Sequence, residues 1–407
     1  MSLRKRVAGP TVLLLILGVI QVMSLFRTLP SPACGRIQNL GHHAHVLINC
    51  DSAVFMKDAQ APQRLINGQS VYQDRPLYAV SNWVLSNSLI KAGFPNRTIP
   101  IRGNSGSITQ YSEIFYLGYL ILNFLILFAA SLLMLKWLKT QFEIPLKNSM
   151  LWLVCLNALL ILTGNELTKT FFWTPHSQMF NILLPAYALY LFARRNELNT
   201  RKFELLNLGA IGALLFCYSL LGILYFIILF SSRRGLLARF RRIFVSIIPY
   251  AMWPFIIQLA GGKYHSIAIT RYREYIWVFD SIKNGDFVSA FLHNESSFAR
   301  TLPLFPASVL LIVFVVWAWQ NRNTFVLKRL LNDLRLQFFI TFLFFYSLMG
   351  YYARRVTLSP ILFADLLAFA VVLKLLHRLS SRIQILLTTG FLVLQLIFWV
   401  FTHGPMQ

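Results

Sequence analysis

Charged residues are scarce in this chain of 407 residues. They make up 13% of it, whereas hydrophobic residues make up 57%. A soluble domain of this length would carry about 25% charged residues. The composition therefore excludes an ordinary soluble enzyme and indicates a polytopic membrane protein. Cysteine is also scarce, and four residues are too few for a disulfide framework.

Carboxylates are scarcer than cations, with 14 Asp and Glu against 38 Lys and Arg and a net charge of +24. The chain has no basic tail, zinc-ligand spacing or helix-turn-helix pattern that would make nucleic acid its partner. In a membrane protein such a surplus usually marks cytoplasmic loops. The sequence also has no Gly-rich phosphate loop and no nucleophile elbow. It therefore predicts no metal and no cofactor, and it gives no support to a mechanism driven by ATP or a nucleotide sugar.

Eleven apolar segments predict an all-α, polytopic transmembrane bundle that forms a single domain over residues 1–407. The segments are 8–26, 114–135, 150–163, 179–193, 203–216, 218–230, 243–260, 301–319, 336–350, 359–373 and 384–401. Residues 203–230 could form one long helix. Basic residues on both flanks favour instead a hairpin of two short helices that turns near Cys217 and Tyr218.

The distribution of basic residues predicts the orientation. Arg4, Lys5 and Arg6 precede the first segment and predict a cytoplasmic N-terminus. Because no small-residue cleavage site follows Phe26, this segment is not expected to be a cleaved signal peptide. With alternating spans, about one residue in three is basic in the inner segments, against about one in ten in the outer ones.

This topology leaves two large outer loops, residues 27–113 and 261–300. Within the first, residues 53–66 and 76–92 have a helical apolar periodicity and could lie along the membrane interface. Two N-glycosylation patterns begin at Asn96 and Asn294, but the pattern is short enough to arise by chance. Nothing else points to a eukaryotic host, so we expect a bacterial plasma membrane.

The first outer loop carries an ordered series of residues. Asp51 follows the first span, Phe55 comes four residues later, and then come the turn Leu65-Ile66-Asn67-Gly68, Tyr72 and Arg75-Pro76. This series resembles the first outer loop of the GT-C superfamily, polytopic glycosyltransferases that take a sugar from a polyprenyl-phosphate donor. The resemblance implies transfer with inversion on the outer face to a glycan, lipid or protein acceptor, with Asp51 as the catalytic base.

The chemistry gives an independent reason for a lone carboxylate. Inverting transfer needs a base for the acceptor hydroxyl, and a phosphate leaves without being protonated. Asp51 could alternatively cap a helix that begins at Ser52 or Ala53. Asp58 lies seven residues later on the same helix face, where it could bind the acceptor or assist Asp51, or belong to a solvated face.

The short outer turn between the third and fourth spans carries two further candidates for substrate binding, Glu166 and His176. Polar groups beside the membrane often bind ligands. The alternatives are an ion pair between Glu166 and Lys169, and a helix-capping role for His176.

Arginine on the outer side departs from the positive-inside trend and could hold a lipid phosphate, because its guanidinium is forked and always charged. The outer candidates for substrate binding are Arg75, Arg271, Arg273, Arg354 and Arg355. The pair at 354–355 could instead bind lipid headgroups or pair with Asp365. The aromatic and cationic segment 264–291 could instead be an interfacial helix.

Two cysteines, Cys34 and Cys50, fall in the first outer loop and could form a disulfide if that side is oxidising. Cys155 and Cys217 fall within apolar spans and are expected to be core residues.

Two other functions compete with glycosyl transfer. A transporter or lipid flippase without chemistry would have polar residues at mid-membrane and related halves, and the sequence shows no inverted repeat. A polymerase or ligase for lipid-linked glycans would usually carry its Arg- and His-rich outer loop late in the chain.

Overall fold

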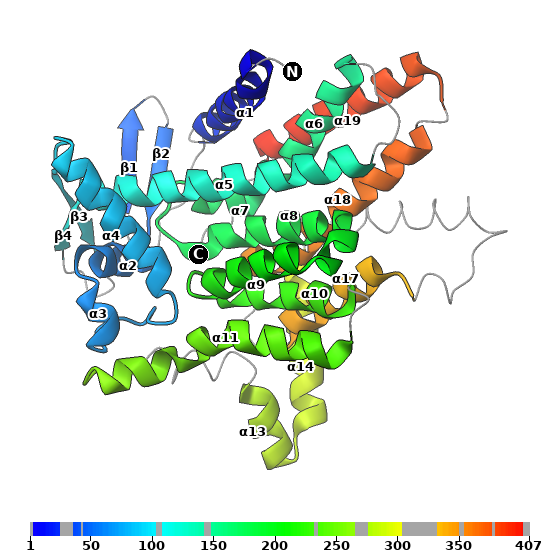
Figure 1. The fold of residues 1–407 in the computed structure, drawn as a ribbon. Coiled ribbons are helices and arrows are strands. Elements are labelled where there is room, and N and C mark those ends of the chain that lie inside the picture. The colour runs from blue at the N-terminus through cyan, green and yellow to red at the C-terminus, as the bar shows by residue number, and fades with distance from the viewer. Residues whose placement is uncertain are drawn as a thin grey trace.

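The computed structural model describes residues 3–24, 36–41, 44–102, 108–141, 148–231, 235–264, 276–302, 332–349, 354–376 and 379–401. Within these ranges the fold is helical apart from two small β-hairpins (Figure 1). The predicted all-α class is therefore confirmed. The hairpins were not predicted.

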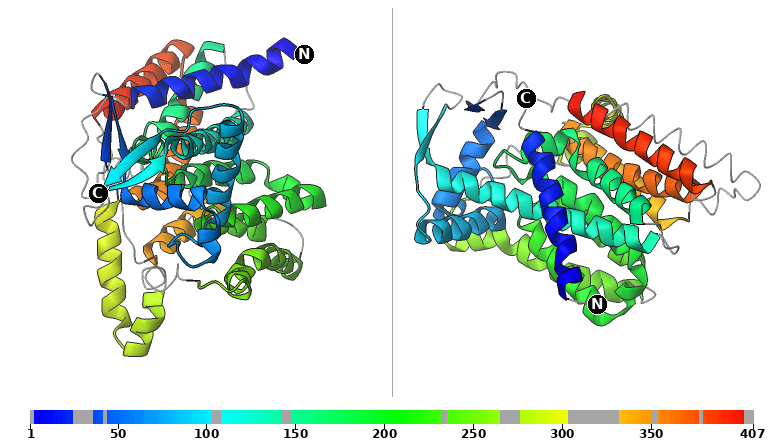
Figure 2. Two further views of the ribbon diagram at one scale, coloured as in Figure 1. Left: turned by 90° about the vertical axis from the view of Figure 1, so that its left-hand side faces the viewer. Right: turned by 90° about the horizontal axis from the view of Figure 1, so that it is seen from above.

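After α1 (Leu3–Met23), the chain builds a group of small elements that we call the end cap. It consists of β1 (Arg36–Gly41), β2 (Ala44–Ile48), α2 (Cys50–Gln60), α3 (Gln63–Ile66), α4 (Pro76–Lys91), β3 (Thr98–Arg102) and β4 (Ile108–Ser112). The strands form two separate antiparallel pairs, β1 with β2 and β3 with β4. Figures 1 and 2 show that the end cap gathers at one end of the helical bundle.

The bundle contains the longer helices. They are α5 (Glu113–Gln141), α6 (Asn148–Thr163), α8 (Phe180–Ala193), α9 (Arg201–Leu215), α10 (Leu224–Ser231), α11 (Leu236–Leu259), α17 (Leu334–Ser347), α18 (Arg354–Leu376) and α19 (Ser381–Phe401). Short helices connect some of them: α7 (Glu166–Phe171), η1 (Ser177–Met179), η2 (Arg195–Asn199) and η3 (Ser219–Ile223). The pair α13 (Trp277–Asn284) and α14 (Phe287–Thr301) projects from the side of the bundle (Figure 1).

Every predicted apolar segment that lies in the described part of the chain coincides with a helix. Residues 303–319 of the predicted segment 301–319 lie outside that part. The segment 203–230 is broken between Leu215 and Ser219, as expected for two short helices. Among the described residues, three helices are long and apolar enough to cross a membrane: Glu113–Thr140, Leu236–Leu259 and Thr357–Leu376. The apolar parts of the other helices reach 10–17 residues within the described part of the chain.

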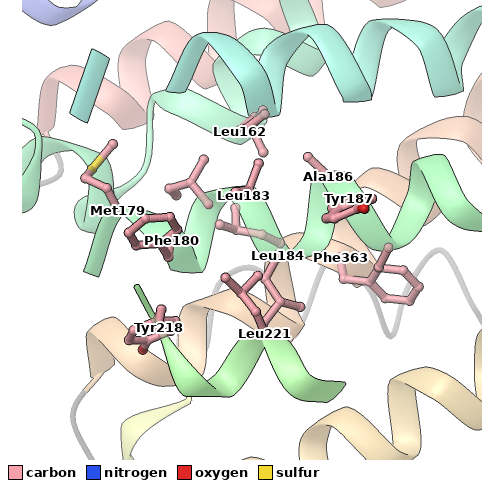
Figure 3. Packing of buried hydrophobic residues seen from close by; sticks show 14 of the residues in the cluster. Leu162, Met179, Phe180, Leu183, Leu184, Ala186, Tyr187, Tyr218, Leu221 and Phe363 are labelled. Carbon is pink, nitrogen blue, oxygen red and sulfur yellow. The ribbon is translucent and has the colours of Figure 1, made fainter. Parts of the chain in front are cut away.

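The core is built around α8, whose residues are nearly all buried because it has apolar side chains on every face. It packs against α5, α10 and α18. Figure 3 shows Leu162 of α6, Leu221 of η3 and Phe363 of α18 around the side chains of α8. This packing joins α6, η3 and α18 through α8.

The helix α11 lies at the edge of the bundle and exposes apolar side chains along much of its length. They include Leu237, Phe244, Phe255 and Leu259. A contiguous apolar surface of this kind on a soluble monomer would be costly, whereas in a bilayer it faces lipid.

Close contacts attach the end cap to the bundle. Gly118 of α5 lets α4 approach, because a Cβ there would lie 1.9 Å from Asn82 Oδ1. The Nε2 of Gln73 donates to the carbonyls of Leu65 (2.7 Å) and Lys263 (3.0 Å), and Trp253 Nε1 of α11 donates to the carbonyl of Gln73 (2.7 Å). The end cap is therefore anchored to both α5 and the end of α11.

Candidate active site in the end cap

The start of α2 positions Asp51. Asn49 is the N-cap, and its Oδ1 accepts hydrogen bonds from the backbone N–H and the hydroxyl of Ser52, each at 2.8 Å. Since the helix begins at Cys50 and Asn49 caps it, the alternative that Asp51 is the cap is wrong. Asp51 lies in the first turn, where the helix dipole favours a carboxylate.

Asp51 faces His176 across the site. The distance from His176 Nε2 to Asp51 Oδ2 is 3.4 Å. The Asp51 side chain is 43% exposed, whereas that of His176 is only 4% exposed. The structure thus brings together two candidates that are far apart in the sequence. Of the two side chains, the Asp51 carboxylate is the one exposed to solvent.

The second nitrogen of His176 is also engaged. Its Nδ1 accepts the backbone N–H of Gln178 at 3.2 Å, so His176 caps η1 as one alternative predicted. A neutral imidazole with an accepting Nδ1 carries its proton on Nε2. The Nε2–H therefore points to the Asp51 carboxylate.

A buried amide holds the backbone that leads to His176. The Nδ2 of Asn123, on α5, donates to the carbonyls of Phe171 and Phe172 (3.0 Å each) and Thr174 (3.2 Å). The Tyr78 hydroxyl lies 2.9 Å from Asn123 Oδ1 and 3.2 Å from the His176 carbonyl oxygen. The turn therefore has a fixed position relative to α4 and α5.

Tyr72 is a second neighbour of Asp51. Its ring stacks on Phe55 with a centroid distance of 4.3 Å, and its hydroxyl is hydrogen-bonded to Asp51. Burial, and after it the negative charge of Asp51, raise the pKa of Tyr72. The hydroxyl therefore stays protonated and can donate to the carboxylate.

Arg75 lies on the other side of Tyr72. Its guanidinium is over the rings of Tyr72 (5.3 Å) and Tyr218 (5.5 Å), and Nη1 donates to Ser177 Oγ at 2.5 Å. Asp74 Oδ2 accepts from Arg75 Nε at 3.3 Å. The side chain is 13% exposed, so Arg75 is a largely enclosed cation that is paired with Asp74 and contacts Tyr72, the neighbour of Asp51.

The structure places Asp58 differently from both readings of the sequence. It is fully buried, so the solvated-face alternative is wrong. Its carboxylate accepts from the hydroxyl of Ser70 and from Arg64 Nε (3.3 Å). Burial raises the pKa of Asp58, and the hydrogen bonds from Ser70 and Arg64 oppose this rise. These contacts tie α2 to the loop before Tyr72 and favour a structural role over substrate binding.

The remaining candidates are placed only in part. Glu166 begins α7, after the cap Asn165, and its side chain lies outside the described part, so the ion pair with Lys169 stays a prediction. Arg271 and Arg273 lie outside the described residues altogether.

Arg354 and Arg355 form the first turn of α18, which begins before the segment predicted at 359–373. Their side chains lie outside the described part. The second turn of α18 lies beside the start of α8, directly after η1, because Ser359 Oγ donates to the carbonyl of Asn181 at 2.8 Å. The backbone of both arginines is therefore at the end of the bundle that carries His176.

Cys50, at the start of α2, is disulfide-bonded, whereas Cys155 and Cys217 are free. Cys34, the partner expected from the sequence, lies outside the described residues. Within the described part, no three His, Cys, Asp or Glu side chains gather in a group that could hold a metal ion.

Three residues of this site had no role in the sequence-based prediction. Tyr72 was noted only as part of the motif, whereas Ser177 and Asn123 were not singled out. The sequence contained a signal for Asn123, because a side-chain amide inside an apolar span is energetically costly unless it is hydrogen-bonded to other groups. The assembled site offers an oriented, accessible carboxylate, and an enclosed arginine that shares the neighbour Tyr72 with it. Comparisons of the chain with protein-family models, with curated proteins and with solved structures found no match.

Proposed function

We propose that the protein is an integral-membrane glycosyltransferase. It would transfer a sugar from a polyprenyl-phosphate donor to an acceptor hydroxyl, with inversion, on the outer face of a bacterial plasma membrane. The observation that carries the proposal is the Asp51 carboxylate, which is accessible on one side and held by His176 and Tyr72 on the other.

The proposed membrane topology has about eleven spans and a cytoplasmic N-terminus. Three helices of sufficient length, several shorter apolar helices and the exposed apolar face of α11 support it. The end of α1 supports the orientation, because Trp173 Nε1, in the turn before His176, donates to the carbonyl of Gln21 (3.1 Å) and lies 3.0 Å from Ser24 Oγ. If the site faces outward, α1 then begins on the inner side.

Asp51 is the proposed base. As the sugar migrates, the proton of the acceptor hydroxyl passes to the Asp51 carboxylate, the new glycosidic bond forms and the bond to phosphate breaks with its electron pair. The polyprenyl phosphate leaves as an anion and needs no acid. A single carboxylate is therefore sufficient, and the other acidic group of α2, Asp58, is already satisfied by Ser70 and Arg64.

Arginines are the proposed partners of the donor phosphate. Arg75 supplies a largely enclosed guanidinium over the ring of Tyr72, which is itself hydrogen-bonded to Asp51. Arg354 and Arg355 occupy the first turn of α18, where the positive end of the helix dipole disfavours cations and favours an anion. A bound phosphate would offset both the dipole and the two charges. Arg271 and Arg273 stay predicted contributors.

Two measurements test the proposal on protein reconstituted in liposomes. Polyprenyl phosphate, added alone, should raise the unfolding midpoint of the wild type, and less so for Arg75→Gln, because a ligand that binds the folded state stabilises it. A set of labelled polyprenyl-phosphate hexoses and pentoses should give transfer by the wild type, and loss of about 100-fold or more in Asp51→Asn.

The matched control is Asp286→Asn, because Asp286 is an exposed carboxylate before α14, outside the proposed site. It should keep wild-type transfer. Normal transfer by a folded Asp51→Asn protein would refute the role of the base. Movement of lipid or solute without any sugar donor would support the transporter alternative instead.

A further inference from the structure

We infer that His176 is a positioning residue, which fixes the Asp51 carboxylate and does not contact the substrate. The inference rests on the proposed function for the identity of the base. It changes the role expected from the sequence, in which His176 was a candidate for substrate binding.

The geometry assigns this role because both ring nitrogens have protein partners. Nδ1 accepts the N–H of Gln178 and Nε2 lies 3.4 Å from Asp51 Oδ2. The ring is also enclosed by aromatic side chains, with centroid distances of 5.0 Å to Phe171 and 5.3 Å to Phe55. An acceptor hydroxyl can therefore reach Asp51 but meets no available nitrogen of His176.

A neutral N–H donor suits a carboxylate that must remain basic. A lysine or arginine at this place would form an ion pair, which would lower the pKa of the carboxylate and weaken it as a base. The neutral imidazole orients one carboxylate oxygen with a weaker hydrogen bond. In the proposed reaction His176 keeps its Nε2 proton throughout, and the acceptor proton passes to Asp51 and then to water.

The support behind the ring explains how the orientation is kept. Asn123 binds three carbonyls of the preceding turn, and Tyr78 links Asn123 to the carbonyl of His176. Errors of about 1 Å in the position of a reacting group can reduce a rate about 100-fold. The imidazole of His176 is a rigid hydrogen-bond donor opposite the accessible side of Asp51. It should therefore affect kcat more than the affinity for substrate.

Two amide variants separate the functions of the two nitrogens. In His176→Asn the Oδ1 can replace Nδ1 and keep the hydrogen bond from Gln178, but the shorter side chain does not reach Asp51. In His176→Gln the longer side chain can place its Nε2 near Asp51. We expect His176→Asn to lower kcat about 10- to 100-fold with little change in KM for donor or acceptor, and His176→Gln to recover part of the loss.

Two outcomes would overturn the inference. A higher KM with unchanged kcat in His176→Asn would indicate direct substrate contact. An equal loss in both variants would indicate that only the packing of the ring matters, and a loss in His176→Gln alone would indicate that only the capping of η1 matters.

A spectroscopic measurement separates this inference from the proposed function. In protein labelled with [15N]histidine, the signals absent from His176→Asn belong to His176. We expect a protonated Nε2, an unprotonated Nδ1, and a shift of the Nε2 signal in Asp51→Asn. A His176 signal that does not respond to Asp51→Asn would overturn the positioning role even if glycosyl transfer is found. A responsive signal in a protein that transfers no sugar would support the contact and refute the proposed function.

Discussion

The contact between α4 and α5 gives a prediction with a magnitude that follows from the structure. In Gly118→Ala the new Cβ would lie 1.9 Å from Asn82 Oδ1 and 2.4 Å from Ser86 Oγ, where ordinary contacts are at least 3.4 Å. Asn82 and Ser86 are both fully buried. Asn82 Nδ2 donates to the carbonyl of Phe115 at 2.9 Å, and Ser86 Oγ donates to Asn82 Oδ1 at 2.8 Å.

To admit the methyl group, Asn82 must move and give up these two hydrogen bonds. Each contributes about 1 kcal/mol net, and a buried polar group left without a partner costs about 1–3 kcal/mol. Alanine recovers up to about 1 kcal/mol through its higher helix propensity. The expected result is a loss of about 2–4 kcal/mol in the free energy of unfolding.

Gly209→Ala is the matched control, because Gly209 is an exposed glycine of α9 with nothing within 4 Å of an added Cβ. It should leave the unfolding midpoint unchanged or raise it slightly. Both midpoints are measured in the same detergent by tryptophan fluorescence during heating. A Gly118→Ala protein as stable as Gly209→Ala would refute the close packing of α4 on α5. Since α4 begins directly after Arg75, stabilisation by polyprenyl phosphate should also weaken in Gly118→Ala.

Two further predictions concern the supports of the site. Burial raises the pKa of Asp58 above its ordinary value of 3.8. Because the folded state then binds the proton of Asp58 more tightly than the unfolded state, this carboxyl group stabilises the fold fully below pH 3.8, and the stabilisation is lost as the pH rises through the raised pKa. The midpoint of the wild type should therefore rise relative to Asp58→Asn as the pH is lowered from 7 to about 4, and a difference independent of pH would contradict this. Asn123→Leu leaves the carbonyls before His176 without their donor. It should lower the free energy of unfolding by about 1–3 kcal/mol and should also lower kcat. An unchanged unfolding midpoint and kcat would count against the supporting role of Asn123.

Much of the helical fold could be predicted because the apolar pattern is a local property of the sequence. The break between Leu215 and Ser219 followed from the basic flanks of the segment. The start of α18 at Arg354 was missed because charged residues at a helix start look like a loop. The strand pair that joins Thr98–Arg102 to Ile108–Ser112 was missed because short strands give a weak period-two signal.

The site was predictable only as separate candidates. Asp51, His176 and Arg75 carry the residue types that the chemistry needs, but their arrangement depends on how α2, α4 and the η1 turn pack. Asp58 shows the same limit. The apolar periodicity around it fitted an exposed helix face, but Ser70, twelve residues later in the chain, donates a hydrogen bond to it in the interior. Tertiary packing, which a local pattern does not contain, decided its role.

The close approach after α11 has an evolutionary consequence. A Cβ at Gly262 would lie 1.8 Å from the carbonyl oxygen of Ile66, a backbone atom that cannot rotate away. Gly261 beside it has a φ of 78°, which side-chain-bearing residues rarely adopt. Any natural variant that keeps the end cap seated on α11 should therefore retain this glycine pair, even where the surrounding loop has diverged beyond recognition.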